Sequence, residues 1–430
     1  MPPSAPGSRT TATAPPPLPD RPLDPPEQVS TVAVRASGRH PLIYRKMCEG
    51  TVEGSRRPES GDLVRVVDRD RVPIGYGLWN ARSQIALRMI SRGPDAPGRG
   101  FWTDRLELAV ALRRDTLRLD DVANAYRVVH AEADGLSGLI VDRYDDVLSA
   151  EVFSLGMYQR IGPIVAILAE KLDTRHARVS VDARIAEAEG FEGRAASSPD
   201  LPQKTTIREH GVRYRVRFET GHKTGFFCDQ RENRRRFASF CDDRDVLDAC
   251  CYTGGFAVAA RVLAKPREVT GVDLDENAVA LARENANLNG VKINWIHSDA
   301  FHYLRQMHQN GRFFGAIVLD PPKLIARRED WDEGRKKYHD LNLLAMRLAA
   351  PGGVFLSCSC SGLMPRDEFL DLLRAAARRA GRTVRVLAIS EASPDHPFAL
   401  EAPEGAYLKA VWMRLDPAEG SETPTAPESE

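Results

Sequence analysis

Long hydrophobic runs, a net charge and a disulfide pattern are all missing from this 430-residue sequence. No apolar run reaches the roughly twenty residues that a membrane-spanning helix requires, so we predict no membrane partner. Sixty Lys and Arg residues balance sixty Asp and Glu residues, so no overall basic field indicates nucleic-acid binding. The seven cysteines are odd in number and lie mostly in the C-terminal half, unlike the framework of a small secreted domain. The sequence therefore predicts a reduced, cytoplasmic protein.

The spacing that zinc sites use is also missing. Zinc-binding motifs commonly place two ligands about two to four residues apart. The adjacent Cys250 and Cys251 lack that gap, and so do Cys358 and Cys360. We therefore predict no metal, and the thiols are left for packing or for chemistry.

The two ends of the chain are poor in apolar side chains. Residues 1–28 contain ten prolines and lack the hydrophobic segment of a secretory signal. They also lack the Arg-rich, amphipathic character of a transit peptide. Residues 417–430 are similarly short of apolar residues. We predict two disordered tails, 1–28 and 417–430, and we expect the first to be dispensable for chemistry.

The first folded block, residues 29–97, is rich in β-strand signals. Short alternating runs separated by Gly, Asp and Pro turns are typical of a small β-barrel. One interpretation is a generic accessory barrel. The other is a PUA-like RNA-binding domain, because the Gly-Arg-His-Pro sequence at 38–41 and the strands after it resemble that module. This resemblance implies RNA contact at Arg39. The expected strands are 63–67, 73–79 and 84–90.

The second block, residues 98–204, carries little functional signal. A helical stretch at 102–117 precedes turn glycines at positions 135 and 138 and an apolar strand, which together indicate a small α+β domain. Polar residues that alternate along a strand share one solvent face in any case. We predict no catalytic group in this block.

The third block, residues 205–416, alternates strands and helices in the way that predicts a doubly wound parallel sheet, hence an α/β fold. Two final strands joined by a proline-rich loop form a return hairpin, which separates methyltransferase sheets from dehydrogenase sheets. We expect strands at 245–250, 268–273, 293–297, 315–319, 353–358, 384–390 and 407–414, and helices beginning at 256 and covering 276–289 and 366–380.

The turn after the first parallel strand limits the type of cofactor. Residues 248–255 read Asp-Ala-Cys-Cys-Tyr-Thr-Gly-Gly, which is a poor cradle for a pyrophosphate. S-adenosylmethionine has no phosphate and needs only one tight turn, which Gly254 permits. The turn is therefore compatible with S-adenosylmethionine as the cofactor.

Acidic residues end four of the predicted strands. Asp273 lies 25 positions after Asp248, close to the interval of about 20 expected for an acid that binds ribose hydroxyls. Asp299 is placed to meet the adenine amino group. One strand-end acid is weak evidence, because Asp is common in turns and helix caps. Four in register, including Asp320, predict a cofactor site at the carboxyl edge of the sheet.

A family resemblance rests on four motifs: TGHKTGFFCDQR at 220–231, YTGGF at 252–256, DPPK at 320–323 and SCSGLM at 359–364. These motifs are similar to those of the bacterial ribosomal RNA large-subunit methyltransferase I family. The resemblance extends from about residue 29 to residue 415. It implies a Rossmann-like class I methyltransferase domain that depends on S-adenosylmethionine and makes 5-methylcytosine in large-subunit ribosomal RNA. It also implies that Gln230, Arg231 and Tyr252 line the cofactor pocket.

The implied chemistry needs a thiol. Carbon 5 of cytosine is too electron-poor to take a methyl group directly, whereas thiolate attack at carbon 6 produces an enamine that can. A cysteine is suited because its pKa of about 8.5 can be lowered by a positive neighbour and its sulfur leaves readily. Cys358 still belongs to its strand, so we predict that Cys360, just beyond it, is the nucleophile. We predict that Asp320 hydrogen-bonds the cytosine edge, and the sequence does not identify the base that removes the carbon-5 proton.

Two alternatives stay open at this point. The first alternative to the cytosine methyltransferase is a methyltransferase for a guanine nitrogen, which needs no cysteine nucleophile. The second is a non-catalytic RNA-binding factor for ribosome assembly. If the substrate is RNA, we expect an unpaired or flipped base. We expect phosphate contacts from the first block and from Lys323, Arg327 and Arg328. The choice between a monomer and a homodimer is not made by the sequence.

Overall fold

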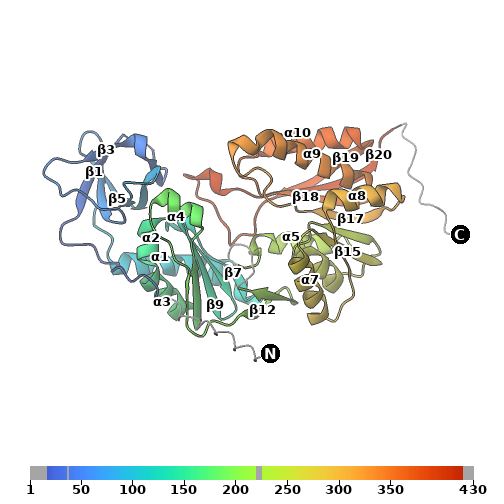
Figure 1. Ribbon diagram of the computed structural model, residues 1–430, viewed down its shortest axis with the longest axis horizontal. Coiled ribbons are helices and arrows are strands. Elements are labelled where there is room, and N and C mark those ends of the chain that lie inside the picture. The colour runs from blue at the N-terminus through green and yellow to red at the C-terminus, as the bar shows by residue number, and fades with distance from the viewer. Residues whose placement is uncertain (1–16, 36–37, 219–224, 420–430) are drawn as a thin grey trace, which may run out of the picture. The chain divides into compact units, whose positions relative to one another are not determined.

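The computed structural model describes residues 17–35, 38–218 and 225–419, and it divides into two compact units (Figure 1). Unit 1 holds the described residues up to 108 together with 135–142 and 146–203, and unit 2 holds 109–134, 143–145 and the described residues from 204 onwards. Positions 220–224 of the first family motif lie outside the described residues, as do 1–16 and 420–430 of the two predicted tails.

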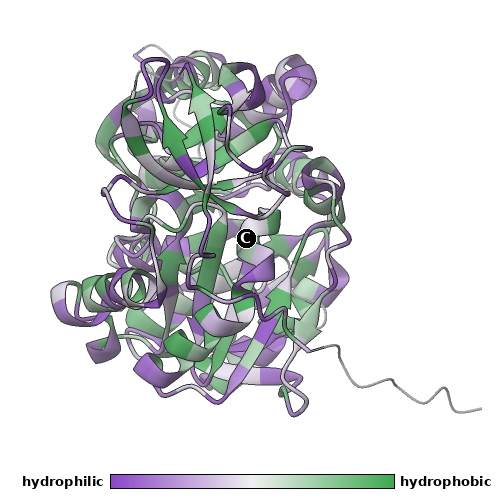
Figure 2. Cartoon of the chain, turned by 90° about the vertical axis from the view of Figure 1, so that its left-hand side faces the viewer, coloured by the Kyte–Doolittle hydropathy of each residue, from purple (hydrophilic) through white to green (hydrophobic). Residues whose placement is uncertain are grey.

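Unit 1 begins with a six-stranded sheet in the order β2-β6-β5-β4-β1-β3. Its inward-facing side chains, such as Val32, Val64, Val66 and Leu87, form one buried cluster. Most positions of β4, β5 and β6 are buried, and Figure 2 shows long hydrophobic stretches, in green, along the strands of this sheet. The three strands predicted for this block are confirmed as β4, β5 and β6. The strands are β1 (Ser30–Val34), β2 (Leu42–Tyr44), β3 (Cys48–Thr51), β4 (Leu63–Val67), β5 (Pro73–Trp79) and β6 (Ile85–Ser91).

Residues 17–28 differ from the predicted disordered tail. Leu23 is buried, and the Arg21 guanidinium lies 2.5 Å from the carboxylate of Asp62. The backbone N–H of Arg21 also donates to the carbonyl of Gln159 at 2.8 Å. Proline-rich composition hides these contacts, because they depend on partners far away in the sequence. The prediction is therefore corrected for this part of the segment, which packs on unit 1.

The rest of unit 1 combines short strands with helices that cover them. Strands β9 and β10 are parallel, and β11 pairs with β10 in the antiparallel direction. Helix α3 buries an apolar face that includes Ile161, Ile164 and Leu168. The elements of this region are α1 (Arg99–Ala111), β8 (Leu139–Tyr144), β9 (Val147–Val152), α2 (Leu155–Gln159), α3 (Ile161–Leu172), β10 (His176–Ser180), α4 (Ala183–Glu189) and β11 (Ala196–Ser197).

The predicted central domain, 98–204, is not a unit of its own. Residues 109–134, which include β7 (Ala125–His130), group with the C-terminal block. A fully buried Arg113 explains part of this grouping: its guanidinium bonds both carboxylate oxygens of Asp134 at 2.6 and 2.9 Å and the carbonyl of Asp395 at 2.8 Å. Asp395 lies 282 positions away, so this contact leaves no local sequence signal.

Unit 2 is built on a seven-stranded sheet in the order β16-β15-β14-β17-β18-β20-β19. Strands β14 to β18 pair in the parallel direction, and β20 pairs antiparallel with both β18 and β19. The predicted parallel sheet and its return hairpin are therefore confirmed. The strands are β14 (Asp245–Ala249), β15 (Glu268–Asp273), β16 (Asn294–His297), β17 (Phe314–Leu319), β18 (Ala349–Ser359), β19 (Arg382–Ser390) and β20 (Lys409–Pro417).

Helices cover both faces of this sheet, each with its own buried cluster. One cluster joins α8, α9 and α10 to the sheet through residues such as Leu304, Leu341 and Phe369. The other joins α5 and α6 through Phe237 and Phe256. An antiparallel hairpin of β12 (Lys204–Glu209) and β13 (Val212–Arg217) precedes the sheet. The helices are α5 (Arg231–Ala238), α6 (Gly255–Leu263), α7 (Glu276–Leu288), α8 (Ala300–Gln309), α9 (Trp331–Arg347) and α10 (Arg366–Arg379).

Candidate active site

The carboxyl ends of the parallel strands bring the predicted acids to one level. Ala249, the last residue of β14, pairs with Val272 on β15 and with Leu319 on β17. The residues that follow these three, Cys250, Asp273 and Asp320, therefore leave the sheet side by side. Burial raises the pKa of the Cys250 thiol, and the carboxylates of all four predicted acids raise it further. The four acids thus converge on the turn after β14.

Asp248 supports this turn from beneath. Its carboxyl group is fully buried and accepts a hydrogen bond from the Ala257 backbone N–H at 2.8 Å, at the start of α6. Burial raises its pKa to about 8, and the Ala257 hydrogen bond only partly offsets this rise. The structure thus gives Asp248 a supporting role in the turn, and its contact with the cofactor stays a prediction.

The turn itself has an unusual backbone. Cys250 and Tyr252 have φ angles of 63° and 49°, in the left-handed region that non-glycine residues rarely adopt. The Tyr252 backbone N–H donates to the Asp273 carboxylate at 2.7 Å, which holds this conformation. Gly254 has a φ of 79°, and a Cβ there would lie 2.4 Å from the Trp295 ring. The glycine is therefore required by both backbone and packing.

Asp273, Asp299 and Tyr252 remain accessible around this turn. Asp273 is half-buried and accepts N–H groups from Tyr252 and Asp275, the second at 2.9 Å. Asp299 is exposed and caps α8 by accepting from the His302 N–H at 3.0 Å. The Tyr252 ring packs edge-to-face on Phe227 with a centroid distance of 5.2 Å. These positions agree with the predicted edge of a ligand site.

A chain of hydrogen bonds fixes Asp320. The Gln230 amide donates to its carboxylate at 3.1 Å, and the Asn233 amide donates to the Gln230 carbonyl oxygen at 2.7 Å. The Ser390 hydroxyl donates to Asn233 Oδ1 at 2.7 Å and accepts from Trp412 Nε1 at 2.8 Å. An indole N–H can only donate, so Trp412 makes the Ser390 hydroxyl the donor to Asn233, and the Asn233 amide also donates to the Glu391 carbonyl at 3.3 Å. The Gln230 side chain therefore presents its N–H to Asp320.

The side chain of Arg231 forms an ion pair within unit 2. It is fully buried and bonds both carboxylate oxygens of Asp395, at 3.1 and 2.8 Å. Burial opposes ionisation of Asp395, but His396 and Arg231 outweigh it and hold its pKa well below the ordinary value. This pair anchors the loop between β19 and β20 to α5. The structure thus gives the Arg231 guanidinium a structural partner, and its contact with the cofactor stays a prediction from the resemblance.

The two thiols at the end of β18 differ in environment. Cys358 is fully buried within the strand, and burial raises its pKa well above the ordinary value, with Asp320 adding to the effect. Cys360 is half-buried and lies just beyond the strand. Leu319 pairs with Ser357, so the end of β18 leaves the sheet next to Asp320. Position thus separates a packing thiol from an accessible one, as the sequence predicted.

The turn that carries Cys360 is fixed by its neighbour Ser361. The Ser361 hydroxyl is buried and lies 3.1 Å from the Ile325 N–H and 3.0 Å from the Tyr338 hydroxyl. Its carbonyl accepts from Lys409 Nζ at 2.6 Å. Lys409 was not predicted from the sequence to have a role. Its position in the apolar run LKAVWM at 408–413 nevertheless indicates a buried charge.

The predicted basic positions are exposed. Lys323, Arg327 and Arg328 follow β17 on the surface of unit 2, close after Asp320. Arg39 is exposed on unit 1. Lys323 also lies near enough to Lys409 to lower its pKa. The three cations of unit 2 therefore lie just beyond the strand that carries Asp320.

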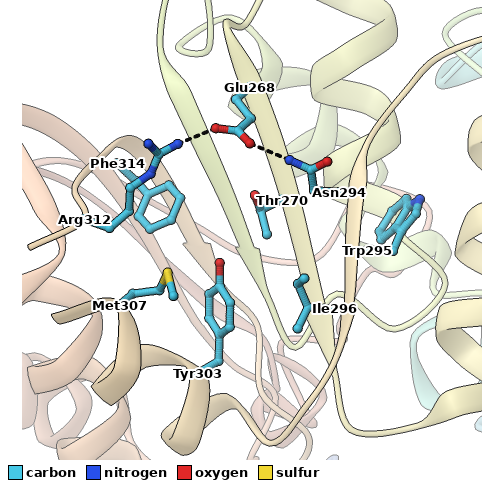
Figure 3. A pocket seen from close by; sticks show the side chains of 9 residues that line it. All are labelled: Glu268, Thr270, Asn294, Trp295, Ile296, Tyr303, Met307, Arg312 and Phe314. Atoms are coloured by element: carbon cyan, nitrogen blue, oxygen red, sulfur yellow. Dashed lines mark hydrogen bonds and ion pairs between the residues drawn. The ribbon is translucent and has the colours of Figure 1, made fainter. Parts of the chain in front are cut away.

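One cavity of unit 2, of about 440 Å³, lies away from these acids (Figure 3). Glu268 stands at its edge and bonds the side chains of Asn294 and Arg312. Glu268 and Asp273 are the first and last residues of β15, so about 16 Å of strand separates them. In Figure 3, Trp295 lies apart from the other labelled side chains. None of the four acids lines this cavity, although Trp295, which packs against Gly254 of the turn, belongs to its lining.

The described residues contain neither a metal-binding cluster nor a membrane-spanning helix. No group of three or more His, Cys, Asp or Glu side chains within them could hold a metal ion. Across the same ranges, none of the helices has both the length and the apolar character needed to cross a membrane.

Comparisons with known proteins agree with this architecture. Residues 31–92 match a model of the PUA-like domain, and residues 194–414 match the S-adenosylmethionine-dependent methyltransferase family. A methyltransferase from Streptococcus mutans has the same fold, with a TM-score of 0.73 at 18% identity over 89% of this chain and 99% of its own. Another solved methyltransferase, in complex with SAH, gives a TM-score of 0.74 at 18% identity over 90% of this chain and 100% of its own.

Curated relatives show a closer relationship. A protein of Pseudoalteromonas atlantica named ribosomal RNA large subunit methyltransferase I is 34% identical over 88% of this chain and 95% of its own length. The protein of that name from Aeromonas hydrophila is 36% identical over 87% of this chain and 95% of its own length. Together with the S-adenosylmethionine-dependent methyltransferase domain, these matches show that the chain belongs to the ribosomal RNA large subunit methyltransferase I family.

Proposed function

We propose that this protein methylates carbon 5 of a cytosine in large-subunit ribosomal RNA through a covalent bond to Cys360. One observation carries the proposal: an accessible thiol follows β18 at the strand end next to Asp320, while its neighbour Cys358 is buried. The names of the curated relatives supply the class of RNA. The choice of carbon 5 rests on the thiol, because methyl transfer to a guanine nitrogen needs no nucleophile from the protein.

The residues around the turn after β14 fit S-adenosylmethionine. Asp273 accepts backbone N–H groups and keeps an accessible carboxylate, which suits ribose hydroxyls, and the exposed Asp299 suits an adenine amino group. Tyr252 and Gln230 lie beside them. When bound, the cofactor supplies an electrophilic methyl group on a positively charged sulfur. These carboxylates orient it and balance its charge.

Cys360 and Asp320 act on the cytosine. The Cys360 thiolate attacks carbon 6, and the ring becomes an enamine that is nucleophilic at carbon 5. Asp320 holds the cytosine edge that carries N3 and the exocyclic amine, and Gln230 fixes its carboxylate. After carbon 5 is methylated, a base removes its proton and the carbon–sulfur bond breaks. The released thiolate completes the cycle.

RNA recognition draws on exposed cations. Lys323, Arg327 and Arg328 are suited to phosphates near the reacting base, and Arg39 to phosphates on the PUA-like domain. The cytosine must be unpaired or flipped out of its stack, because carbon 6 is otherwise covered by neighbouring bases. A loop or an assembly intermediate of the ribosomal RNA offers such a base.

The test compares Cys360→Ala with Cys358→Ala on unmethylated large-subunit ribosomal RNA. Incorporation of labelled methyl groups should fall at least about a thousandfold in C360A, and C358A should stay within about tenfold of the wild type. Bisulfite mapping should locate the product at a cytosine. RNA that contains 5-fluorocytosine should trap a covalent complex with the wild type but not with C360A, since fluorine does not leave as a proton would.

Each alternative gives a different result in the same experiment. Methyl transfer retained in C360A, with the product at a guanine, would replace the cytosine mechanism. No methyl transfer by the wild type, together with no binding of S-adenosylmethionine in calorimetry, would favour a non-catalytic RNA-binding factor. Calorimetry on C360A gives the folding control, because the variant should bind the cofactor like the wild type.

A further inference from the structure

Lys409 is a buried cation that the chemistry above leaves unused. It begins β20 and is only 5% exposed. Among the described residues, no carboxylate forms an ion pair with it, and its recorded hydrogen bonds go to two backbone carbonyls. A buried, unpaired ammonium group is costly, so a lysine in such a place tends to lose its proton or to find an anion.

The register of the sheet places Lys409 against Cys360. Antiparallel pairing sets Lys409 directly opposite Ser359, the residue before Cys360. The Nζ atom then reaches the carbonyl of Ser361, the residue after Cys360, at 2.6 Å. A second bond, to the Tyr407 carbonyl at 2.9 Å, holds the other side of the amine. The lysine thus spans both chain neighbours of the cysteine.

We propose that Lys409 accepts the thiol proton of Cys360 and then pairs with the thiolate. This inference rests on the proposed function, because it concerns the activation of the same nucleophile. A neutral amine has two N–H groups, which match the two carbonyls, and one lone pair, which is left for the thiol. The S–H bond breaks, its electron pair stays on sulfur and a third N–H bond forms. The new N–H donates to the thiolate.

The charged groups around Cys360 act in both directions: the Asp320 carboxylate at the neighbouring strand end disfavours a thiolate, and the Lys409 ammonium group favours it. Burial lowers the pKa of Lys409 to about 8, the charge on Cys360 raises it and Lys323 lowers it. An ordinary thiol has a pKa of about 8.5, so the proton moves between two groups of similar basicity. Tyr338 and Cys358 also face Cys360, and neither brings a positive charge. Lys409 is thus the buried cation in contact with this turn.

Alkylation of the free protein tests the inference without RNA or cofactor. Iodoacetamide reacts with thiolates, and mass spectrometry of the Cys360 peptide gives its rate at each pH. Lys409→Met should raise the pH midpoint of this rate by about one unit and slow the reaction at pH 7 about tenfold. Lys409→Gln keeps two N–H groups for the carbonyls but has no base, so it should behave like K409M even if the methionine variant folds poorly.

Cys48 provides an internal control in the same sample. It lies in unit 1, and burial raises its pKa to about 11, so its profile should be the same in all variants. An unchanged Cys360 profile in K409M and K409Q would overturn the role of Lys409 while the cytosine mechanism stands. Loss of that mechanism appears instead as methyl transfer by C360A, which alkylation does not measure. The two proposals can therefore fail separately.

Discussion

The carboxylates at the two ends of strand β15 differ in their bonding partners. At the amino end, Glu268 is bonded by the cationic side chain of Arg312. At the carboxyl end, Asp273 accepts only backbone N–H groups among its recorded bonds, and the nearby Asp248 and Asp299 do the same. No Lys or Arg forms an ion pair with these three acids in the part of the chain that the structure describes. At the amino end the carboxylate is thus paired with a cation. At the carboxyl end the buried Asp248, whose pKa is raised to about 8, keeps its proton at neutral pH, and the carboxylates of Asp273 and Asp299 are left for a cationic ligand such as a sulfonium.

Loss of Asp320 should have the largest effect on the carboxyl end. Asp320→Ala removes the acid that we propose to hold the cytosine, so the rate of methyl transfer should fall about a hundredfold to ten-thousandfold. Labelled methyl incorporation into ribosomal RNA measures it. Asp416→Ala, which removes a half-buried acid near the end of β20, is the matched control and should keep the wild-type rate. A D320A enzyme within tenfold of the wild type would remove Asp320 from the mechanism.

Neutralising one acid at each end of β15 tests whether the two ends differ in cofactor binding. Asp273→Asn should weaken S-adenosylmethionine binding about tenfold to a hundredfold, because a hydrogen bond to a charged group contributes about 1.5–3 kcal/mol. Glu268→Gln should leave that affinity unchanged. Isothermal calorimetry measures both dissociation constants. Equal losses in the two variants would mean that the ends do not differ in function.

Much of this carboxyl end could be predicted from the sequence, because it depends on local patterns. Apolar runs that end in Asp predict the strands and the acidic residues at their carboxyl ends. Gly290 likewise predicts the end of α7. Contacts between distant segments could not be predicted in this way. Arg231 matches a motif, yet Asp395 binds it from 164 positions away. Lys409 was included in a predicted strand, and only the register with β18 shows that it meets the turn of Cys360.

The buried acid of the rim should give a distinct dependence on pH. The unfolded chain releases the Asp248 proton near pH 4, while burial holds it in the folded state up to about pH 8. Folding stability due to this group is therefore lost as pH rises between these values, by at most about 1.4 kcal/mol per unit. Asp248→Asn removes this loss, so its stability relative to the wild type should increase from pH 5 to pH 8.

Thermal unfolding of both proteins across this range measures that difference. Asp299→Asn replaces an exposed acid of the same rim and serves as the control, since its effect should change little with pH. A difference between D248N and the wild type that stays constant from pH 5 to pH 8 would contradict the raised pKa.

The smallest effect is expected from the chain of hydrogen bonds behind Asp320. Ser390→Ala disconnects Trp412 from Asn233, whose amide is then oriented by the Glu391 carbonyl, so the Gln230 amide is held less firmly toward Asp320. We expect methyl transfer to slow about fivefold, which corresponds to about 1 kcal/mol, with unchanged affinity for S-adenosylmethionine. Ser390→Thr keeps the hydroxyl and should restore the rate. Equal rates for S390A and S390T would show that the Ser390 hydroxyl does not orient Asp320.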